Sequence, residues 1–360
     1  MKVTKIVVSP LDPYMSLISV ETDEGISGWG SCFMAPSLAE ACVPLFSEMI
    51  VGKDPVQNEK IIEDIHESSM WIGRGGVVTI FISAIDIALW DIRGKKFDTS
   101  VSRLLGARYR ESIKPYASML FGPVDDLEKR LTDAYEAGYR AFKLGWQPFG
   151  RIDAASDESL IRRARKTIGD GCDLMVDAGG SEAYWHNDLK WAVRTSRMLE
   201  QYNVLWFEEA LSDQNMIGHA ALRAASPIWI ASGETFRKRQ AFQSWIETGA
   251  LDVVQPDLSA VGGISEGRRI AWSAQDHGML TVFHGWNTAV GLSADLQLNA
   301  SLPHGRFVEF KTPSPYIEEL LVAPFKIDGD GLLPIPDGPG LGIEIDKDRL
   351  EYFVREFEGG

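Results

Sequence analysis

The fold follows from three stretches of sequence, DLMVD (173–177), VLWFE (204–208) and PIWIASGE (227–234). Each is a short apolar run that ends at, or just before, an acidic residue. Such runs are typical of strands that are buried on both faces of a parallel sheet. The three acids lie roughly 25–30 residues apart, which leaves room for a helix in each connection. The stretches therefore predict a repeat of strand and helix.

The same repeat extends outward in both directions. Eight apolar runs alternate with amphipathic helical stretches: Pro115–Ser118, Ala141–Trp146, Asp173–Val176, Val204–Phe207, Pro227–Ala231, Leu251–Val254, Met279–Phe283 and Arg306–Phe310. Eight strands that alternate with helices over roughly 200 residues are typical of a (β/α)₈ barrel. We therefore predict an α/β fold of the TIM-barrel type.

The two ends of the chain do not continue this repeat. Residues 2–8 and 16–21 alternate like strands, and a helical stripe from Val77 to Leu89 follows. We expect Gly94 to end this helix near Arg93–Lys96. Residues 316–360 are rich in proline and glycine at their centre. We expect an N-terminal α+β unit, with the C-terminal segment packed back on it.

Composition and charge narrow the class of protein. The net charge of −15 disfavours a nucleic-acid partner, which requires a basic surface. The three cysteines, Cys32, Cys42 and Cys172, do not form a disulfide framework or a CxxC pair. No apolar run approaches the roughly 18 residues of a membrane-spanning helix. These features predict a cytoplasmic enzyme that does not bind membranes.

Ionisable residues end seven of the eight runs. They are Lys143, Asp177, Glu208, Glu234, Asp257, His284 and Glu309. In a (β/α)₈ barrel the carboxyl ends of the strands converge on one face, where the active site lies. Each residue alone could open a loop or cap a helix, but seven in succession predict a single catalytic site.

The residue types indicate the chemistry of this site. Asp177, Glu208 and Glu234 form an all-oxygen ligand set, which suits Mg²⁺ better than zinc. A carboxylate beside an imidazole raises its basicity, so Asp257 and His284 are candidates for a general base. Together they predict metal-assisted removal of the α-proton of a carboxylate substrate.

These residues resemble a known family. The residues that carry the resemblance are Lys143, Asp177, Glu208-Glu209, Glu234, Asp257 with Gly262-Gly263, and His284. They are similar to the mandelate racemase subgroup of the enolase superfamily, also called the mandelate racemase/muconate lactonizing enzyme group, which uses a Lys or His base with Mg²⁺.

The resemblance implies a (β/α)₇β barrel under an α+β capping domain built from both chain ends. The corresponding division is 1–112 and 316–360 for the cap, and 113–315 for the barrel. It further implies a homo-oligomer, from dimer to octamer. Lys143 is expected to pair with the substrate carboxylate or enediolate, and Glu309 to hydrogen-bond that carboxylate opposite the metal. Glu209 is expected to support the ligands without being one.

Departures from the subgroup pattern refine the function. Gly145 stands where members that work from both faces carry a second lysine, which disfavours a racemase or epimerase. Ala210 and Gly179 replace a common proline and asparagine. The pattern resembles acid-sugar dehydratases of the rhamnonate dehydratase type. We therefore predict a carbon–oxygen lyase that converts an aldonate or aldarate to a 2-keto-3-deoxy acid.

Alternative functions remain open at this point. They are a sugar-acid lactone cycloisomerase or an epimerase on the same scaffold, a Schiff-base aldolase that uses Lys143, and an inactive sugar-acid-binding protein. Trp71, Trp146 and Trp286 are candidates for the walls of the substrate pocket.

Overall fold

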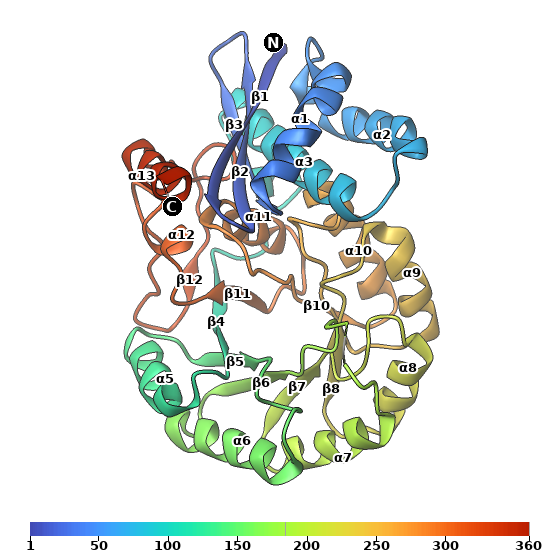
Figure 1. Cartoon of the computed structure of the whole chain (residues 1–360). Coiled ribbons are helices and arrows are strands. Elements are labelled where there is room, and N and C mark those ends of the chain that lie inside the picture. The colour runs from blue at the N-terminus through green and yellow to red at the C-terminus, as the bar shows by residue number, and fades with distance from the viewer. Residues whose placement is uncertain (184, 360) are drawn as a thin grey trace.

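The computed structural model, which describes residues 1–183 and 185–359, contains all eight predicted barrel strands (Figure 1). They are β4 (Ser112–Leu120), β5 (Ala141–Gly145), β6 (Asp173–Asp177), β7 (Val204–Glu208), β8 (Trp229–Ser232), β9 (Val253–Val254), β10 (Leu280–Thr281) and β11 (Phe307–Lys311). The strands are parallel, and their hydrogen-bonded order is β10-β9-β8-β7-β6-β5-β4-β11. The sequential neighbours in this order are what a barrel of right-handed strand–helix units requires.

A helix follows each of the first seven strands. These helices are α5 (Leu127–Glu136), α6 (Ala154–Ile168), α7 (Leu189–Glu200), α8 (Met216–Ala225), α9 (Lys238–Thr248), α10 (Gly263–Asp276) and α11 (Ala289–Ala300). Helices α5 to α10 surround the curved sheet on its outside (Figure 1). Because β11 ends the series, the architecture is (β/α)₇β, and the predicted fold class is confirmed.

Large side chains fill the interior of the barrel below the strand ends. Tyr116, Met175, Trp206 and Phe307 are buried there in one cluster. The rings of Tyr116 and Trp206 meet edge to face, with their centroids 5.8 Å apart. This packing gives the site above it a rigid and dry floor.

The N-terminal unit is a separate three-stranded antiparallel sheet covered by helices. Its order is β1-β2-β3. Its elements are β1 (Val3–Asp12), β2 (Met15–Thr22), β3 (Ser27–Phe33), α1 (Pro36–Ile50), α2 (Asn58–Ser68), α3 (Gly76–Lys96) and α4 (Val101–Leu104). Short 3₁₀ helices cover Pro55–Gln57, Ser69–Trp71 and Val124–Asp126. No described helix combines the length and the apolar composition that crossing a bilayer requires.

Helix α3 ends at Lys96, within the stretch Arg93–Lys96 where we expected its end, but Gly94 lies inside the last turn and does not end it. Gly94 is buried, and a Cβ atom there would lie 2.6 Å from the backbone nitrogen of Gly340. The glycine therefore permits a close approach of the C-terminal segment and does not stop the helix. The neighbouring Asp91 carboxylate accepts a hydrogen bond from the backbone N–H of Leu341 at 2.9 Å.

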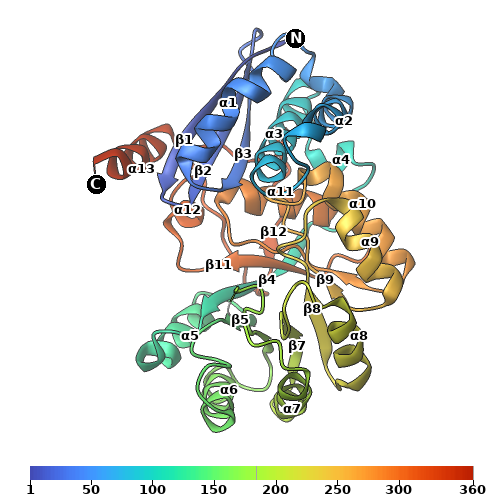
Figure 2. The same ribbon diagram turned by 45° about the vertical axis from the view of Figure 1, so that its right-hand side comes forward.

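The C-terminal segment contacts both units. It contains α12 (Pro315–Glu318), β12 (Leu333–Pro334) and α13 (Lys347–Gly359). Strand β12 pairs antiparallel with barrel strand β4. Helix α13 packs against β1, beside the N-terminal sheet (Figure 2). The division into 1–112, 113–315 and 316–360 stays a proposal, because this segment is joined to the barrel as well as to the N-terminal unit.

The contact between β3 and α3 holds the N-terminal unit together and yields a test. A Cβ atom at Gly30 would lie 2.8 Å from the Cα of Ala84, against the backbone of α3. We expect Gly30→Ala to lower the free energy of unfolding by about 1–3 kcal/mol, because the helix must shift outward. Urea unfolding would measure the change. Gly171→Ala, at an exposed glycine with nothing within 4 Å, is the matched control. Equal stability of the two variants would contradict the close packing.

Candidate active site

The structure brings all seven strand-end residues to one end of the barrel. Strand register places Asp177 beside Gly145 on one side and beside Glu208 on the other. Here a cavity of about 360 Å³ opens. Six of the seven residues line it, namely Lys143, Asp177, Glu234, Asp257, His284 and Glu309. Glu208 is buried beside the cavity, next to the lining residues Lys143, Asp177 and Glu234.

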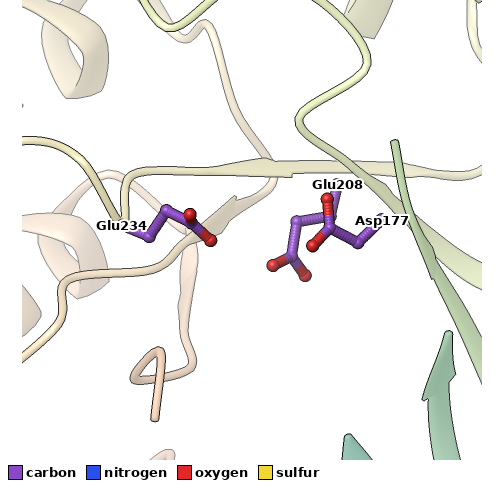
Figure 3. Close-up of side chains that lie close together, drawn as sticks. All are labelled: Asp177, Glu208 and Glu234. Atoms are coloured by element: carbon purple, nitrogen blue, oxygen red, sulfur yellow. The ribbon is translucent and has the colours of Figure 1, made fainter. Parts of the chain in front are cut away.

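Three carboxylates converge in this site. One oxygen each from Asp177, Glu208 and Glu234 lies within 4.8 Å of the other two. Figure 3 shows the three groups turned toward a common gap. Burial raises the pKa of Asp177 well above its usual value, and the charge of Glu208 raises it further. Burial also raises the pKa of Glu234, although the imidazole of His284 opposes this change. Such a cluster has an excess of negative charge and fits a hard divalent cation.

Both oxygens of Glu208 already accept hydrogen bonds. Lys143 Nζ donates to Oε1 at 2.6 Å, while Trp206 Nε1 and Gln255 Nε2 donate to Oε2 at 2.9 and 2.7 Å. A carboxylate oxygen has two lone pairs, so these bonds orient Glu208 and leave it able to bind a cation. Gln255 was overlooked in the sequence, although it is a polar residue directly after the run Val253-Val254. Trp206 carried no such signal, because it lies within an apolar run.

The imidazole of His284 is held on both sides by carboxylates. Its Nδ1 lies 2.8 Å from Asp257 Oδ2, and its Nε2 lies 3.3 Å from Glu234 Oε2. Asp257 is fixed in turn by Ser259, whose backbone N–H and hydroxyl donate to Oδ1 at 2.7 and 2.6 Å. Burial alone would lower the pKa of His284, but the facing carboxylates, above all Glu234 and Glu309, hold it well above its usual value.

Lys143 joins the metal side of the site to Glu309. Its Nζ lies 3.0 Å from Glu309 Oε1. Ser118 Oγ and the backbone N–H of Gly285 also donate to Glu309, at 2.5 and 2.7 Å. Burial alone would lower the pKa of Lys143, but the charges of Glu208 and Glu309 hold it well above its usual value. Burial alone would raise the pKa of Glu309, yet Lys143 and His284 lower it to about 2. The pair is therefore ionised.

Glu209 directly follows Glu208 in the chain but is not one of the three converging carboxylates. It is buried, has φ of 46°, and accepts a hydrogen bond from the backbone N–H of Ser181 at 3.0 Å. Burial raises its pKa well above the usual value, and the charges of Glu234 and Asp177 add to this effect. It is outside the group whose oxygens converge.

The remaining wall of the cavity is largely apolar. Its apolar members are Phe33, Met119, Leu120, Trp146 and Trp286. Of the three tryptophans that we expected there, Trp71 is 89 % exposed and lies outside the set of described lining residues. The indole of Trp146 packs over Gly179, where a Cβ would lie 2.9 Å from the ring. A side chain at position 179 would therefore collide with the indole.

Comparison with known proteins agrees with this architecture. The family model described as Mandelate racemase / muconate lactonizing enzyme, N-terminal domain matches residues 11–106, and the model described as Enolase C-terminal domain-like matches residues 126–349. The D-galactarolactone cycloisomerase of Agrobacterium fabrum is 35% identical, over 94% of this chain and 90% of that protein. The D-galactonate dehydratase of Variovorax paradoxus is 30% identical, over 99% of this chain and 95% of that protein.

A solved structure shows the same fold over the whole chain. The crystal structure of the 3,6-anhydro-D-galactonate cycloisomerase from Zobellia galactanivorans aligns with a TM-score of 0.90 and 29% identity. The alignment covers 98% of this chain and 99% of the other. The chain is therefore an enzyme that belongs to the mandelate racemase subgroup of the enolase superfamily.

Proposed function

We propose that the protein is a Mg²⁺-dependent acid-sugar dehydratase, which removes the α-proton of an aldonate or aldarate with His284. The observation that carries this proposal is the His284–Asp257 pair, 2.8 Å apart, in one cavity with three converging carboxylates. The dehydratase relative supports the choice of reaction.

Asp177, Glu208 and Glu234 would hold the Mg²⁺ ion, since their oxygens converge and no softer ligand is present among them. When bound, Mg²⁺ offsets the negative charge that develops on the substrate carboxylate as the adjacent carbon loses its proton. Lys143, which is buried and charged, supplies a second positive charge to the same carboxylate.

Asp257 and Glu234 together set the tautomer and the protonation state of His284. Asp257 accepts the hydrogen bond from Nδ1–H, which leaves the Nε2 lone pair of the neutral ring as the proton acceptor. Glu234 faces Nε2, and its charge favours the protonated ring. His284 can therefore act as a neutral base only when the charge of Glu234 is matched, so filling the carboxylate site and activating the base are coupled.

Glu309 acts through Lys143 in this proposal. An ionised carboxylate accepts hydrogen bonds and donates none, so the expected bond from Glu309 to the substrate carboxylate requires Glu309 to gain a proton. In the structure it accepts from Lys143, Ser118 and Gly285. We assign it the positioning of Lys143.

Proton removal is followed by loss of the β-oxygen. The α C–H bond breaks and its proton moves to Nε2 of His284. The β C–O bond then breaks, and the hydroxyl takes the proton from His284 and leaves as water. The enol that remains tautomerises to the 2-keto-3-deoxy acid. One base on one face is sufficient for these steps, whereas a racemase needs two.

A lactone cycloisomerase is the second candidate, favoured by the 35% identical relative of that name and by the solved neighbour. The first step is the same. The leaving group is then a ring oxygen at the β-carbon, which takes the proton from His284 and remains attached to the product. The product therefore has the same mass as the substrate.

The cytoplasmic location, the homo-oligomeric assembly and the absence of a nucleic-acid partner stay predictions from the sequence.

Proton NMR and mass spectrometry together test the reaction. The Mg²⁺-loaded enzyme is incubated in D₂O with pools of aldonates, aldarates and their lactones. In D₂O we expect the α-proton signal to disappear and a deuterated C3 methylene to form. In a parallel incubation in H₂O we expect the product to lose the mass of one water. A product of unchanged mass from a lactone in H₂O would replace the dehydratase with the cycloisomerase. No reaction in any pool would reject the acid-sugar substrate.

His284→Asn tests the base. We expect kcat to fall by roughly 10²–10⁴-fold or more, because the proton acceptor is lost. Steady-state kinetics gives this value, and calorimetric titration with Mg²⁺ shows whether the metal site is intact. His277→Asn is the matched control, since His277 is exposed and bonds only to the Ser273 carbonyl in its own turn. An active His284→Asn enzyme would reject the assignment.

Glu234→Gln and Glu209→Gln test the ligand set. We expect Glu234→Gln to weaken Mg²⁺ binding by at least about tenfold more than Glu209→Gln, because it removes a charged ligand oxygen. Glu209→Gln changes only a buried residue that binds Ser181. Titration calorimetry compares the two variants at the same pH. Equal losses of affinity would mean that Glu209 belongs among the ligands.

A further inference from the structure

We propose that Trp146 is a specificity-determining residue, whose indole forms a stacking surface for the ring of a cyclic sugar acid. The inference rests on the proposed α-proton abstraction and favours the second candidate, in which a ring oxygen is the leaving group. It deepens that function by naming a substrate class, a lactone or anhydro sugar in preference to an open-chain acid.

The first argument is the polarity of the cavity. Apart from the reactive cluster and the indole N–H groups of Trp146 and Trp286, the polar side chains among its described lining residues are Ser118 and Ser181. The hydroxyl of Ser118 already donates to Glu309, so few polar groups remain to bind substrate hydroxyls. An open-chain sugar acid carries a hydroxyl on each inner carbon, and burying these without partners is costly. The apolar wall instead fits a compact ring that presents C–H bonds.

The second argument is the conformation of Trp146. Its φ of 65° is one that bulky side chains rarely adopt. Two backbone hydrogen bonds hold Trp146 in this conformation. Its N–H donates to the Asp177 carbonyl at 3.0 Å, and its carbonyl accepts from the Phe149 N–H at 3.1 Å. Gly179, which has φ of 65° itself, leaves the space that the indole occupies. Strained residues that the surroundings hold in place are concentrated at ligand sites.

The third argument is the position of the indole relative to the base. Trp146 directly follows β5, and His284 lies beyond β10. Strands β6 to β9 separate the two in the hydrogen-bonded order, and both residues line the cavity. Between the indole and the carboxylates, Gly145 has no side chain, and a Cβ there would lie 3.1 Å from Asp177 Oδ2. The substrate is therefore bounded by the base on one side and by a flat apolar surface on the other. That arrangement suits a ring whose C–H face rests on the indole.

The test compares two forms of one substrate. The wild-type enzyme and Trp146→Ala are assayed with galactarate and its lactone, or with the corresponding pair of any acid sugar that reacts in the NMR screen. We expect the wild type to favour the lactone. We expect Trp146→Ala to lower kcat/KM for the lactone about tenfold, mainly through KM, and to leave the open-chain acid within about threefold. The ratio of the two substrates is the decisive readout, because a merely structural defect lowers both equally.

Further variants separate stacking from folding. Trp146→Phe keeps a flat ring and should retain most of the preference for the lactone. Gly179→Asn places a side chain against the indole, tolerates positive φ better than other residues, and should reproduce the loss. Trp272→Ala, at an exposed tryptophan of α10, is the control and should change nothing. Thermal unfolding and Mg²⁺ affinity confirm that each variant is folded and binds metal.

The outcomes distinguish the two proposals. Equal losses on both substrates, or a wild-type preference for the open-chain acid, would overturn the role of Trp146 and leave the dehydratase proposal standing. A wild-type enzyme that turns over no acid sugar would overturn the proposed function, and this inference with it.

Discussion

A buried ammonium group held between two carboxylates supports the whole reactive end of the barrel. Lys143 is 3 % exposed and pairs with Glu208 at 2.6 Å and with Glu309 at 3.0 Å. Removing one member of such a set leaves an unmatched buried charge, which costs several kcal/mol, about 3–5 in typical proteins. The three charges come from different strands, so the sheet must be in register before any of them is matched. Correct strand register is therefore required both for the barrel and for the charge pairing in the site.

Glu234 contacts both the carboxylate cluster and the imidazole of His284. Its carboxylate converges with those of Asp177 and Glu208, and its Oε2 lies 3.3 Å from Nε2 of His284. In the proposed mechanism, the protonation state of His284 would therefore depend on whether the carboxylate cluster holds a cation. Glu234 would then couple cation binding to the ability of His284 to accept a proton.

Much of the fold was predictable, because apolar runs that end in ionisable residues reveal both the strands and the edge where they meet. The seven strand-end residues lie together for this topological reason. The contacts that orient them were not predictable. Ser118 reaches Glu309 from the neighbouring strand, and Gln255 reaches Glu208 from beyond the next strand but one, so both contacts depend on strand register. The backbone N–H of Gly285 has no signature in sequence. Gly94 was misread because a glycine that ends a helix and one that admits a neighbouring chain look alike until the neighbour is known.

The contact of Gly94 with Gly340 also has a consequence for biosynthesis. Leu341, beside that contact, donates to Asp91 across 250 positions of sequence. Helix α3 is thus synthesised early in translation, but the C-terminal segment that covers its buried face leaves the ribosome only near the end of translation. Contacts of such long range form slowly, and a nascent chain must keep this helix face from other apolar surfaces meanwhile. The N-terminal unit is therefore synthesised first but is among the last parts of the fold to be completed. Its exposed helix face is what a chaperone would have to protect during synthesis.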